Sequence, residues 1–327
     1  MRIAVTGSIA TDHLMVFPGR FAEQLLKEQL EHVSLSFLAD RLEVRRGGVG
    51  ANIAFGLGLL ELNPVLIGAA GLDFAEYGTW LREHGVDTTA VHISDTLHTA
   101  RFVCTTDQDH NQIATFYAGA MAEAARIDLA AVTARTGTPA LVLIGADDPA
   151  AMLRHTATAH RLGLPVAADP SQQLARLDGE QARRLVEGAR WLFTNEYEAA
   201  LLLERTGWSE PQLLDRVGTW ITTLGAGGAT LARAGARRLH VPAVPTGKIT
   251  DPTGAGDAFR CGFLAATAWQ LPHERAAQLG CALATTVLES VGTQEYKLIP
   301  ADLIARIDQT YGHGAARAIE PHLAPAP

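Results

Sequence analysis

Residues 251–259 read D-P-T-G-A-G-D-A-F and lead directly into an apolar segment. The glycines at positions 254 and 256 allow the backbone to turn tightly, so that successive N–H groups can point at one small volume at the start of a helix. N–H groups in this arrangement bind tetrahedral anions such as phosphoryl groups. We therefore predict that the amides of Gly254, Ala255, Gly256 and Asp257 form an anion hole.

The side chain of Asp257 does not suit an anion hole, because its negative charge would repel phosphate. A carboxylate beside a transferring phosphoryl group is best explained as the acceptor of the attacking hydroxyl's proton. The alternative is that Asp257 only caps the helix, as Asp often does. The helix N-terminus should favour the charged carboxylate, which predicts a lowered pKa and a weak base.

The composition predicts a folded protein without nucleic-acid partners. Of the 327 residues, 47% are hydrophobic, the net charge is −8, and there are only three lysines. The basic pair Arg45-Arg46 is expected to be solvated. The three cysteines lack metal-site spacing and fit a reducing compartment. Because no signal peptide and no apolar segment of membrane-spanning length is evident, we expect a cytoplasmic protein that binds no membrane.

Short β-branched runs alternate with helical patterns, which is typical of an α/β fold with a mainly parallel sheet covered on both faces. In such sheets ligands bind at the carboxyl ends of the strands. The predicted strands span residues 2–6, 65–67, 141–144, 166–168, 191–193 and 220–224. The predicted helices span residues 51–62, 76–84, 149–161, 180–188, 196–205, 262–269, 274–288 and 301–311.

Two segments, residues 12–46 and 98–117, are longer than an ordinary connection. The second reads as two strands joined by the polar turn Asp107–Asn111. We predict that both segments form a small β-sheet lid within one domain that spans residues 1–327. The alternative is an edge hairpin with no role in binding. The proline-containing tail, residues 320–327, is expected to be frayed.

Further candidate residues lie in loops after predicted strands. Gly48, in G-G-V-G-A-N, allows close backbone approach to a ligand, and Asn52 offers both a donor and an acceptor. Asp12 can accept hydrogen bonds from the vicinal hydroxyls of a sugar. Each has a simpler interpretation, since glycine loops also serve packing and a loop Asp is often only solvated. No Walker A motif is present, which excludes P-loop kinases.

Two more loops are candidates for a nucleotide site. Asn195-Glu196-Tyr197-Glu198 begins a helix after a strand, and the carboxylate of Glu198 can hold Mg²⁺ or its waters beside phosphates. The helix dipole alone also favours acids in a first turn. Thr223 and Gly225 belong to the glycine loop T-L-G-A-G-G, which can admit a nucleotide or simply pack.

Taken in order, G-S-I-A-T-D, G-G-V-G-A-N, N-E-Y-E, T-L-G-A-G-G and D-P-T-G-A-G-D-A-F resemble the ribokinase-like (PfkB) family of sugar and nucleoside kinases. Pro252 departs from the family, where Thr is commoner, but it precedes the anion hole. The resemblance implies a three-layer core and transfer of the ATP γ-phosphoryl group to a primary hydroxyl of a pentose-like ring. Asp257 would be the general base, and Asp12, Gly48 and Asn52 would hold ribose hydroxyls.

The resemblance also implies an ATP site at Asn195, Thr223 and Gly225, with Glu198 holding Mg²⁺ through water. It further implies a homodimer formed through the β-lid and a monovalent cation, K⁺, near the 251–259 loop.

The substrate is implied by a closer resemblance. G-S-I-A-T-D-H-L-M, V-S-L-S-F-L, A-D-P-S-Q-Q-L-A-R-L and S-V-G-T-Q-E resemble bacterial adenosine kinases, which implies phosphorylation of the 5′-hydroxyl of adenosine to AMP. Aromatic rings can stack on a purine and amides can bind its edge. The residues assigned to the nucleoside on this basis are Ser8, Ser36, Phe37, Phe102, Phe116, Gln172 and Gln173.

Several alternatives stay open. The three phenylalanines can instead pack the lid or a dimer contact. The enzyme can be a kinase of ribose, fructose or another nucleoside, or the protein can be a non-catalytic nucleotide or sugar sensor. A sensor would need no proton acceptor at position 257.

Overall fold

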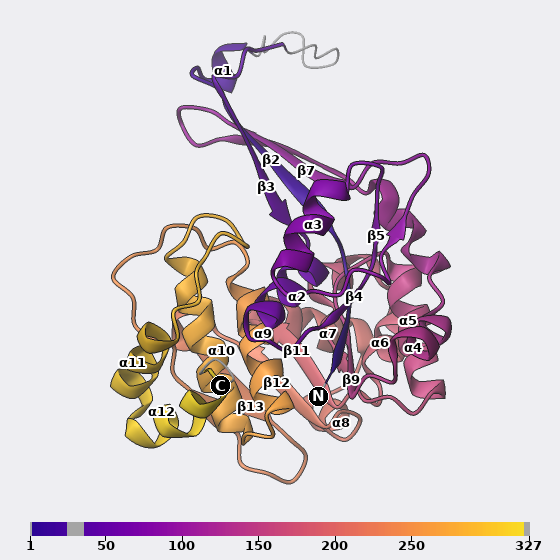
Figure 1. Cartoon of the computed structure of the whole chain (residues 1–327), viewed down its shortest axis with the longest axis vertical. Coiled ribbons are helices and arrows are strands. Elements are labelled where there is room, and N and C mark those ends of the chain that lie inside the picture. Colours follow the sequence, from indigo (N-terminus) through magenta and orange to yellow (C-terminus); the bar gives the residue numbers. More distant parts are fainter. Residues whose placement is uncertain (1, 25–35, 324–327) are drawn as a thin grey trace.

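The computed structural model describes residues 2–24 and 36–323. Figure 1 shows a large α/β core from which a smaller sheet projects at one end. The core sheet has the strand order β14-β13-β12-β11-β10-β9-β1-β4. All pairings from β12 to β4 are parallel, whereas β13 and β14 are antiparallel additions at one edge. The predicted mainly parallel α/β core with a second small sheet is therefore confirmed.

The core strands are β1 (Ile3–Thr6), β4 (Val65–Ile67), β9 (Leu141–Ile144), β10 (Val166–Ala168), β11 (Trp191–Asn195), β12 (Thr219–Thr223), β13 (Ala229–Ala232) and β14 (Leu239–Val241). Successive side chains of a strand point to opposite faces. In β1, Ile3 and Val5 pack into one hydrophobic cluster and Ala4 into the other, so the sheet has a buried layer on each side.

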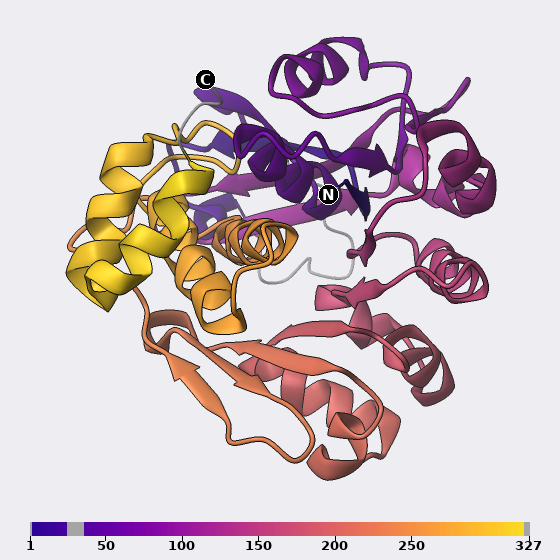
Figure 2. The same ribbon diagram turned by 60° about the horizontal axis from the view of Figure 1, so that its bottom comes forward.

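Helices cover both faces of the sheet, as Figure 2 shows. One face carries α2 (Val49–Leu59), α3 (Ala75–Glu83), α9 (Ala255–Ala268), α10 (His273–Leu288), α11 (Pro300–Tyr311) and α12 (His313–Ile319). The other carries α4 (Leu129–Thr136), α5 (Pro149–Arg161), α6 (Gly179–Val186), α7 (Glu196–Thr206) and α8 (Glu210–Leu214). The short elements β5 (Ala69–Ala70), β6 (His92–Ile93), η2 (Gly119–Arg126), η3 (Ser171–Arg176) and η4 (Gly225–Gly227) lie in the connections. None of the helices within the described ranges combines the length and apolar character needed to cross a membrane.

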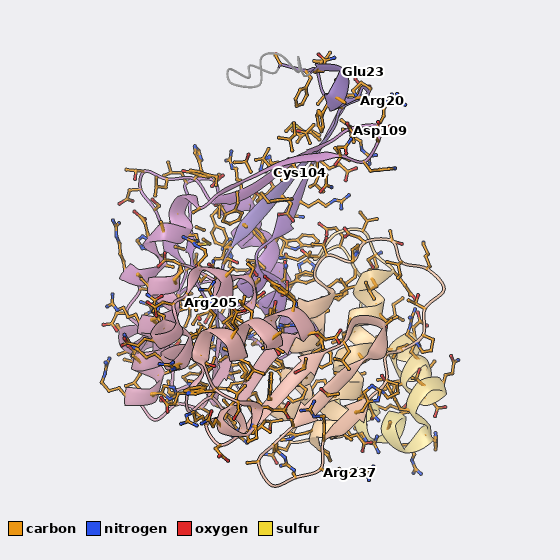
Figure 3. All side chains as sticks on the ribbon, turned by 180° about the vertical axis from the view of Figure 1, so that it is seen from behind. Arg20, Glu23, Cys104, Asp109, Arg205 and Arg237 are labelled. Carbon is orange, nitrogen blue, oxygen red and sulfur yellow. The ribbon has the colours of Figure 1, made fainter. Side chains whose placement is uncertain are left out.

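The smaller sheet has the order β3-β2-β7-β8, with β2 (Ala10–Val16), β3 (Arg41–Gly47), β7 (Ala100–Thr106) and β8 (Gln112–Tyr117). These strands come from the two segments predicted to form the lid. Asp107 closes the β7–β8 turn by accepting hydrogen bonds from the N–H groups of Asp109 and Asn111. At the end of the lid far from the core, Arg20 lies 3.2 Å from Asp109, next to α1 (Phe21–Gln24) (Figure 3). Residues 25–35 of the first predicted segment lie outside the described residues.

The expectation of a frayed tail from residue 320 is wrong for its first part. Glu320–His322 form the short helix η5, and Leu323 is buried against the core, so apolar packing holds this part of the chain. Residues 324–327 lie outside the described residues. The sequence reading also missed β13, β14, α4, α8 and α12, most of which are short elements with weak periodicity.

Candidate active site

The quoted motif forms the loop before α9 and its first turn. Gly254 has φ 78°, and a Cβ atom there would lie 2.8 Å from Cγ2 of Thr293, so only glycine fits without strain. The N–H groups of a first helical turn have no acceptor within the helix. The N–H of Ala255 makes only a long contact of 3.4 Å to the Pro252 carbonyl. The loop therefore presents free amides at a helix N-terminus, as an anion hole requires.

Two cavities meet at this helix end. The first has a volume of about 480 Å³ and is lined by Ser8, Ala10, Asp12, Leu14, Arg45, Gly48, Val49, Asn52, Phe102, Phe116, Met121, Ala146, Gln172, Gln173, Arg176, Asp251, Thr253, Asp257, Gly292 and Thr293. The second, of about 620 Å³, is lined by Val49, Ser171, Gln172, Asn195, Glu196, Tyr197, Glu198, Thr223, Gly225, Gly254, Gly256, Asp257 and Arg260. Asp257 lines both cavities, so a group bound in each can approach the same carboxylate.

The carboxylate of Asp257 is held by an amide from a distant part of the chain. Asn52 Nδ2 donates to Asp257 Oδ2 at 2.8 Å. Burial raises the pKa of Asp257 to about 7, although the Asn52 hydrogen bond and the charge of Arg260 act in the opposite direction. The expectation of a lowered pKa is therefore wrong, because the loss of hydration outweighs the favourable helix end. A pKa near neutrality suits a general base.

Buried charges surround the helix end on the side of the second cavity. Arg260, one turn after Asp257 in α9, donates from Nε and Nη2 to the two carboxylate oxygens of Asp169, each at 2.7 Å. Its Nη2 also lies 3.9 Å from Oε2 of Glu198. Burial raises the pKa of Glu198 against the attraction of Arg260. This single guanidinium thus lies among three carboxylates, one of which is the candidate base.

The lid contributes one row of neighbouring side chains to the first cavity. Arg45, Asp12, Phe102 and Phe116 are paired in that order across β3, β2, β7 and β8, and all four line the cavity. Burial raises the pKa of Asp12 to about 6, while Arg45 lowers it. Arg45 was expected to be a solvated position, but it lies 3.3 Å from Asp251 and faces the cavity. The row places charged groups beside aromatic rings.

The loop before α2 completes the polar end of this cavity. Gly48 has φ 95°, and a Cβ there would lie 2.5 Å from the Ser8 carbonyl oxygen, which explains the glycine. Ser8 Oγ accepts the N–H of Val49 at 3.0 Å and so orders the first turn. Gln172 and Gln173, which belong to η3, also line this cavity. The structure thus brings Ser8, Gly48, Asn52 and both glutamines to one cavity.

The predicted nucleotide residues line the second cavity, but two of them have structural roles as well. Asn195 accepts the N–H of Glu198, and Glu198 accepts the N–H of Asn195, each at 2.8 Å, which is a capping box of α7. Thr223 and Gly225 lie at the end of β12 beside them. Within the described part of the chain, no group of three or more acidic, His or Cys side chains can enclose a metal ion. A lone carboxylate at Glu198 fits Mg²⁺ only in the form usual for nucleotides, shared with phosphates and water.

Two predicted residues lie elsewhere. Phe37 packs on Phe17 and Phe21 at the end of the lid, with ring centroids 4.9 and 5.3 Å apart, and neither Ser36 nor Phe37 lines either of the two cavities. For Phe37 the packing alternative therefore describes this structure. Ala255 also lines neither cavity, although the glycines on both sides of it line the second.

Sequence reasoning missed four residues of the site: Arg45, Arg176, Arg260 and Thr293. Arg260 carried a signal, since it is a charged residue three positions after Asp257 in an otherwise apolar helix. Arg176 and Thr293 lie in the stretches A-D-P-S-Q-Q-L-A-R-L and S-V-G-T-Q-E, which carried the resemblance, whereas Arg45 had no signal separable from an ordinary polar surface residue.

The chain is similar to known kinases in sequence and in structure. Residues 7–300 match the model of a protein family described as pfkB family carbohydrate kinase. A nucleoside kinase of Burkholderia thailandensis in complex with inosine is 32% identical, with a TM-score of 0.82 over 96% of this chain and 99% of that chain. Its ligand-free form superposes with a TM-score of 0.84 at 33% identity, over 94% and 100%. A nucleoside kinase of Methanocaldococcus jannaschii is 29% identical over 250 residues, 76% of this chain and 80% of that protein.

The chain belongs to the pfkB family of carbohydrate kinases. Enzymes of this family are phosphotransferases that use ATP as co-substrate, and the ribokinase-like fold predicted from the sequence is confirmed.

Proposed function

We propose that this protein is a nucleoside kinase that transfers the γ-phosphoryl group of ATP to the 5′-hydroxyl of adenosine, forming AMP and ADP. The observation that carries the proposal is the position of Asp257 in the wall common to both cavities. The first cavity has polar groups suited to a ribose, together with aromatic and amide groups suited to a base. The similar nucleoside kinases support a nucleoside over a free sugar.

In the proposed reaction, the 5′-oxygen attacks the γ-phosphorus while the bond to the β,γ-bridging oxygen breaks and ADP leaves with that electron pair. Asp257 accepts the hydroxyl proton as the new O–P bond forms. The amides of the 254–257 turn stabilise charge on the transferring group. Mg²⁺, held by Glu198 together with phosphates, would neutralise phosphate charge. Asp12 and Asn52 orient the ribose.

We propose further that the protein forms a homodimer through the lid, lies in the cytoplasm and uses K⁺. Exposed apolar side chains on the lid, Leu42 and Val44 on β3 and Tyr117 on β8, support a homodimer through this sheet. The cysteines are free and buried, which suits the reducing cytoplasm. Initial rates in potassium and in tetramethylammonium buffers would test the K⁺ requirement.

Inosine is a second candidate substrate, because of Arg176. This side chain lines the first cavity, as Gln172 and Gln173 do, and makes no ion pair or hydrogen bond with another described residue. A guanidinium only donates, and it pairs well with the O6 and N7 acceptors of a 6-oxopurine. Adenosine carries a donating 6-amino group in place of O6, so its base offers one acceptor fewer at that edge.

A coupled assay of ADP release with adenosine, inosine, guanosine, cytidine, ribose and fructose tests the proposal. We expect the highest kcat/KM with adenosine and low values with both free sugars. A clear preference for ribose or fructose would overturn the nucleoside assignment. Absence of ADP release with the whole panel would favour the non-catalytic sensor.

A further inference from the structure

The amide of Asn52 is held in one orientation by groups outside both cavities. Asn52 Oδ1 accepts from Gln294 Nε2 at 2.9 Å, which leaves Nδ2 to donate to Asp257. The same Gln294 Nε2 donates its other hydrogen to the hydroxyl oxygen of Tyr77 at 2.6 Å. The Tyr77 hydroxyl in turn donates to the carbonyl oxygen of Gly47 at 2.8 Å. Four segments of the chain thus contribute to one row of hydrogen bonds.

The direction of this row is set at its far end. A backbone carbonyl can only accept, so the single hydroxyl hydrogen of Tyr77 goes to Gly47 and the Tyr77 oxygen must accept from Gln294. Gln294 must therefore turn Nε2, not Oε1, toward Tyr77 and Asn52. The Asn52 amide oxygen faces that donor, and its Nδ2 faces the base. Turning the Asn52 amide over would oppose two donors to each other and two acceptors to each other.

Thr293 supports the same orientation without determining it. Its hydroxyl lies 2.9 Å from Asn52 Oδ1 and 3.0 Å from the Arg46 carbonyl oxygen, and it has one hydrogen for these two acceptors. Gln294 is completely buried and Tyr77 nearly so, and neither lines either of the two cavities. Gln294 and Tyr77 therefore reach the carboxylate of Asp257 through the amide of Asn52.

We propose that Gln294 and Tyr77 are positioning residues that fix the polarity of the Asn52 amide, so that Nδ2 always donates to the carboxylate of Asp257. This role rests on the proposed function of Asp257 as the base. The donated hydrogen bond aims one oxygen of Asp257 and leaves the other for the substrate hydroxyl. It also favours the ionised form that can accept a proton.

The substitution Gln294→Glu tests the direction of the row, because it replaces the donor by an acceptor of the same shape. Nδ2 of Asn52 would then be drawn toward Glu and its oxygen would face Asp257. We expect the acid limb of the kcat/KM–pH profile to move upward by about one pH unit, and kcat/KM below that limb to fall about tenfold. Tyr77→Phe, which removes only the hydroxyl, should move the limb in the same direction by less, with the KM for ATP unchanged.

Gln278→Glu is the matched control, since Gln278 is also buried but bonds Arg275 at 2.6 Å in α10 and lines neither cavity. Its profile should coincide with that of wild type. The positioning role is overturned if both site variants keep the wild-type limb while melting temperatures show that they are folded. Titration of the Asp257 carboxyl carbon by ¹³C NMR gives the same comparison without turnover. Two results together would contradict the kinase function and leave the positioning role intact. The wild-type protein would phosphorylate none of the substrates, and the Gln294→Glu variant would still show a raised pKa of Asp257.

Discussion

Arg260 and Asp169 form a two-point ion pair between α9 and the end of β10, in which Nε and Nη2 of the guanidinium each lie 2.7 Å from a carboxylate oxygen. Both side chains are almost completely buried. The pair joins the helix that begins with the anion hole to the strand end that leads into η3. It thereby links the position of Asp257 to those of Gln172 and Gln173 in the first cavity.

Arg260→Met should strongly destabilise the protein. The substitution leaves the Asp169 carboxylate buried without its partner, and breaking a buried pair from one side costs about 3–5 kcal/mol. Urea unfolding followed by circular dichroism measures the change. Arg317→Met, at an exposed arginine of α12, is the control and should alter stability by less than about 0.5 kcal/mol. Equal unfolding midpoints for the two variants would show that the buried pair contributes nothing of this size.

Asp257→Asn should abolish most of the activity and leave binding nearly intact. The amide keeps the shape of the side chain but cannot accept the proton, and general-base assistance is worth roughly 10²–10⁴-fold in rate. Single-turnover rates should fall by that factor, while the Kd for the nucleoside, from calorimetry, changes little. A variant within threefold of the wild-type rate would remove Asp257 from the role of base.

The activity of the wild-type enzyme should rise with pH and level off above about 7, the value to which burial raises the pKa of Asp257. Below that pH the carboxyl is protonated and cannot accept the hydroxyl proton, so kcat/KM falls as pH decreases. Asp12, with a pKa of about 6, should add a second protonation at the acid end. In the wild type, the slope of log kcat/KM against pH should therefore approach two below pH 6, because both carboxyl groups become protonated there. A profile that is flat from pH 5 to 8 is incompatible with both raised values.

Phe116→Ala should weaken the binding of adenosine far more than that of ribose. Phe116 lines the first cavity opposite Phe102 on the next strand, and stacking of a base on an aromatic ring is worth about 1–3 kcal/mol. The KM for adenosine should therefore rise roughly tenfold or more. Phe37→Ala is the control, because Phe37 packs on Phe17 and Phe21 outside the cavity. If both variants affect the two ligands alike, Phe116 serves packing only.

Arg176→Met should discriminate between the two nucleoside candidates. If the guanidinium binds O6 and N7, kcat/KM for inosine should fall about 5- to 150-fold, as expected for a good bidentate contact. Purine riboside, which lacks the 6-oxygen, should lose much less, and adenosine should change least. An equal loss with all three nucleosides would assign Arg176 to a part of the substrate other than the purine edge.

Much of the fold followed from local patterns. The runs at β4, β9 and β10 and the helix α5 have the predicted bounds, because each is a short β-branched or strongly amphipathic segment between turn residues. The lid strands were predicted only approximately, and the hairpin of β13 and β14 was missed. Those strands depend on pairing with neighbours more than on their own periodicity.

The sequence by itself was enough to predict the proposed anion hole and its acid, since the glycines at 254 and 256 and Asp257 lie within one turn and their chemistry is local. Only the tertiary structure decided how that acid behaves. Asn52 lies 205 residues before Asp257, and Gln294 lies 242 residues after Asn52, so no spacing along the chain predicts their hydrogen bonds. The pKa of Asp257 depends on burial and on the charges of Arg260, Asp169 and Glu198, which reach it from separate elements. Burial and the distances between charges exist only once the chain has folded.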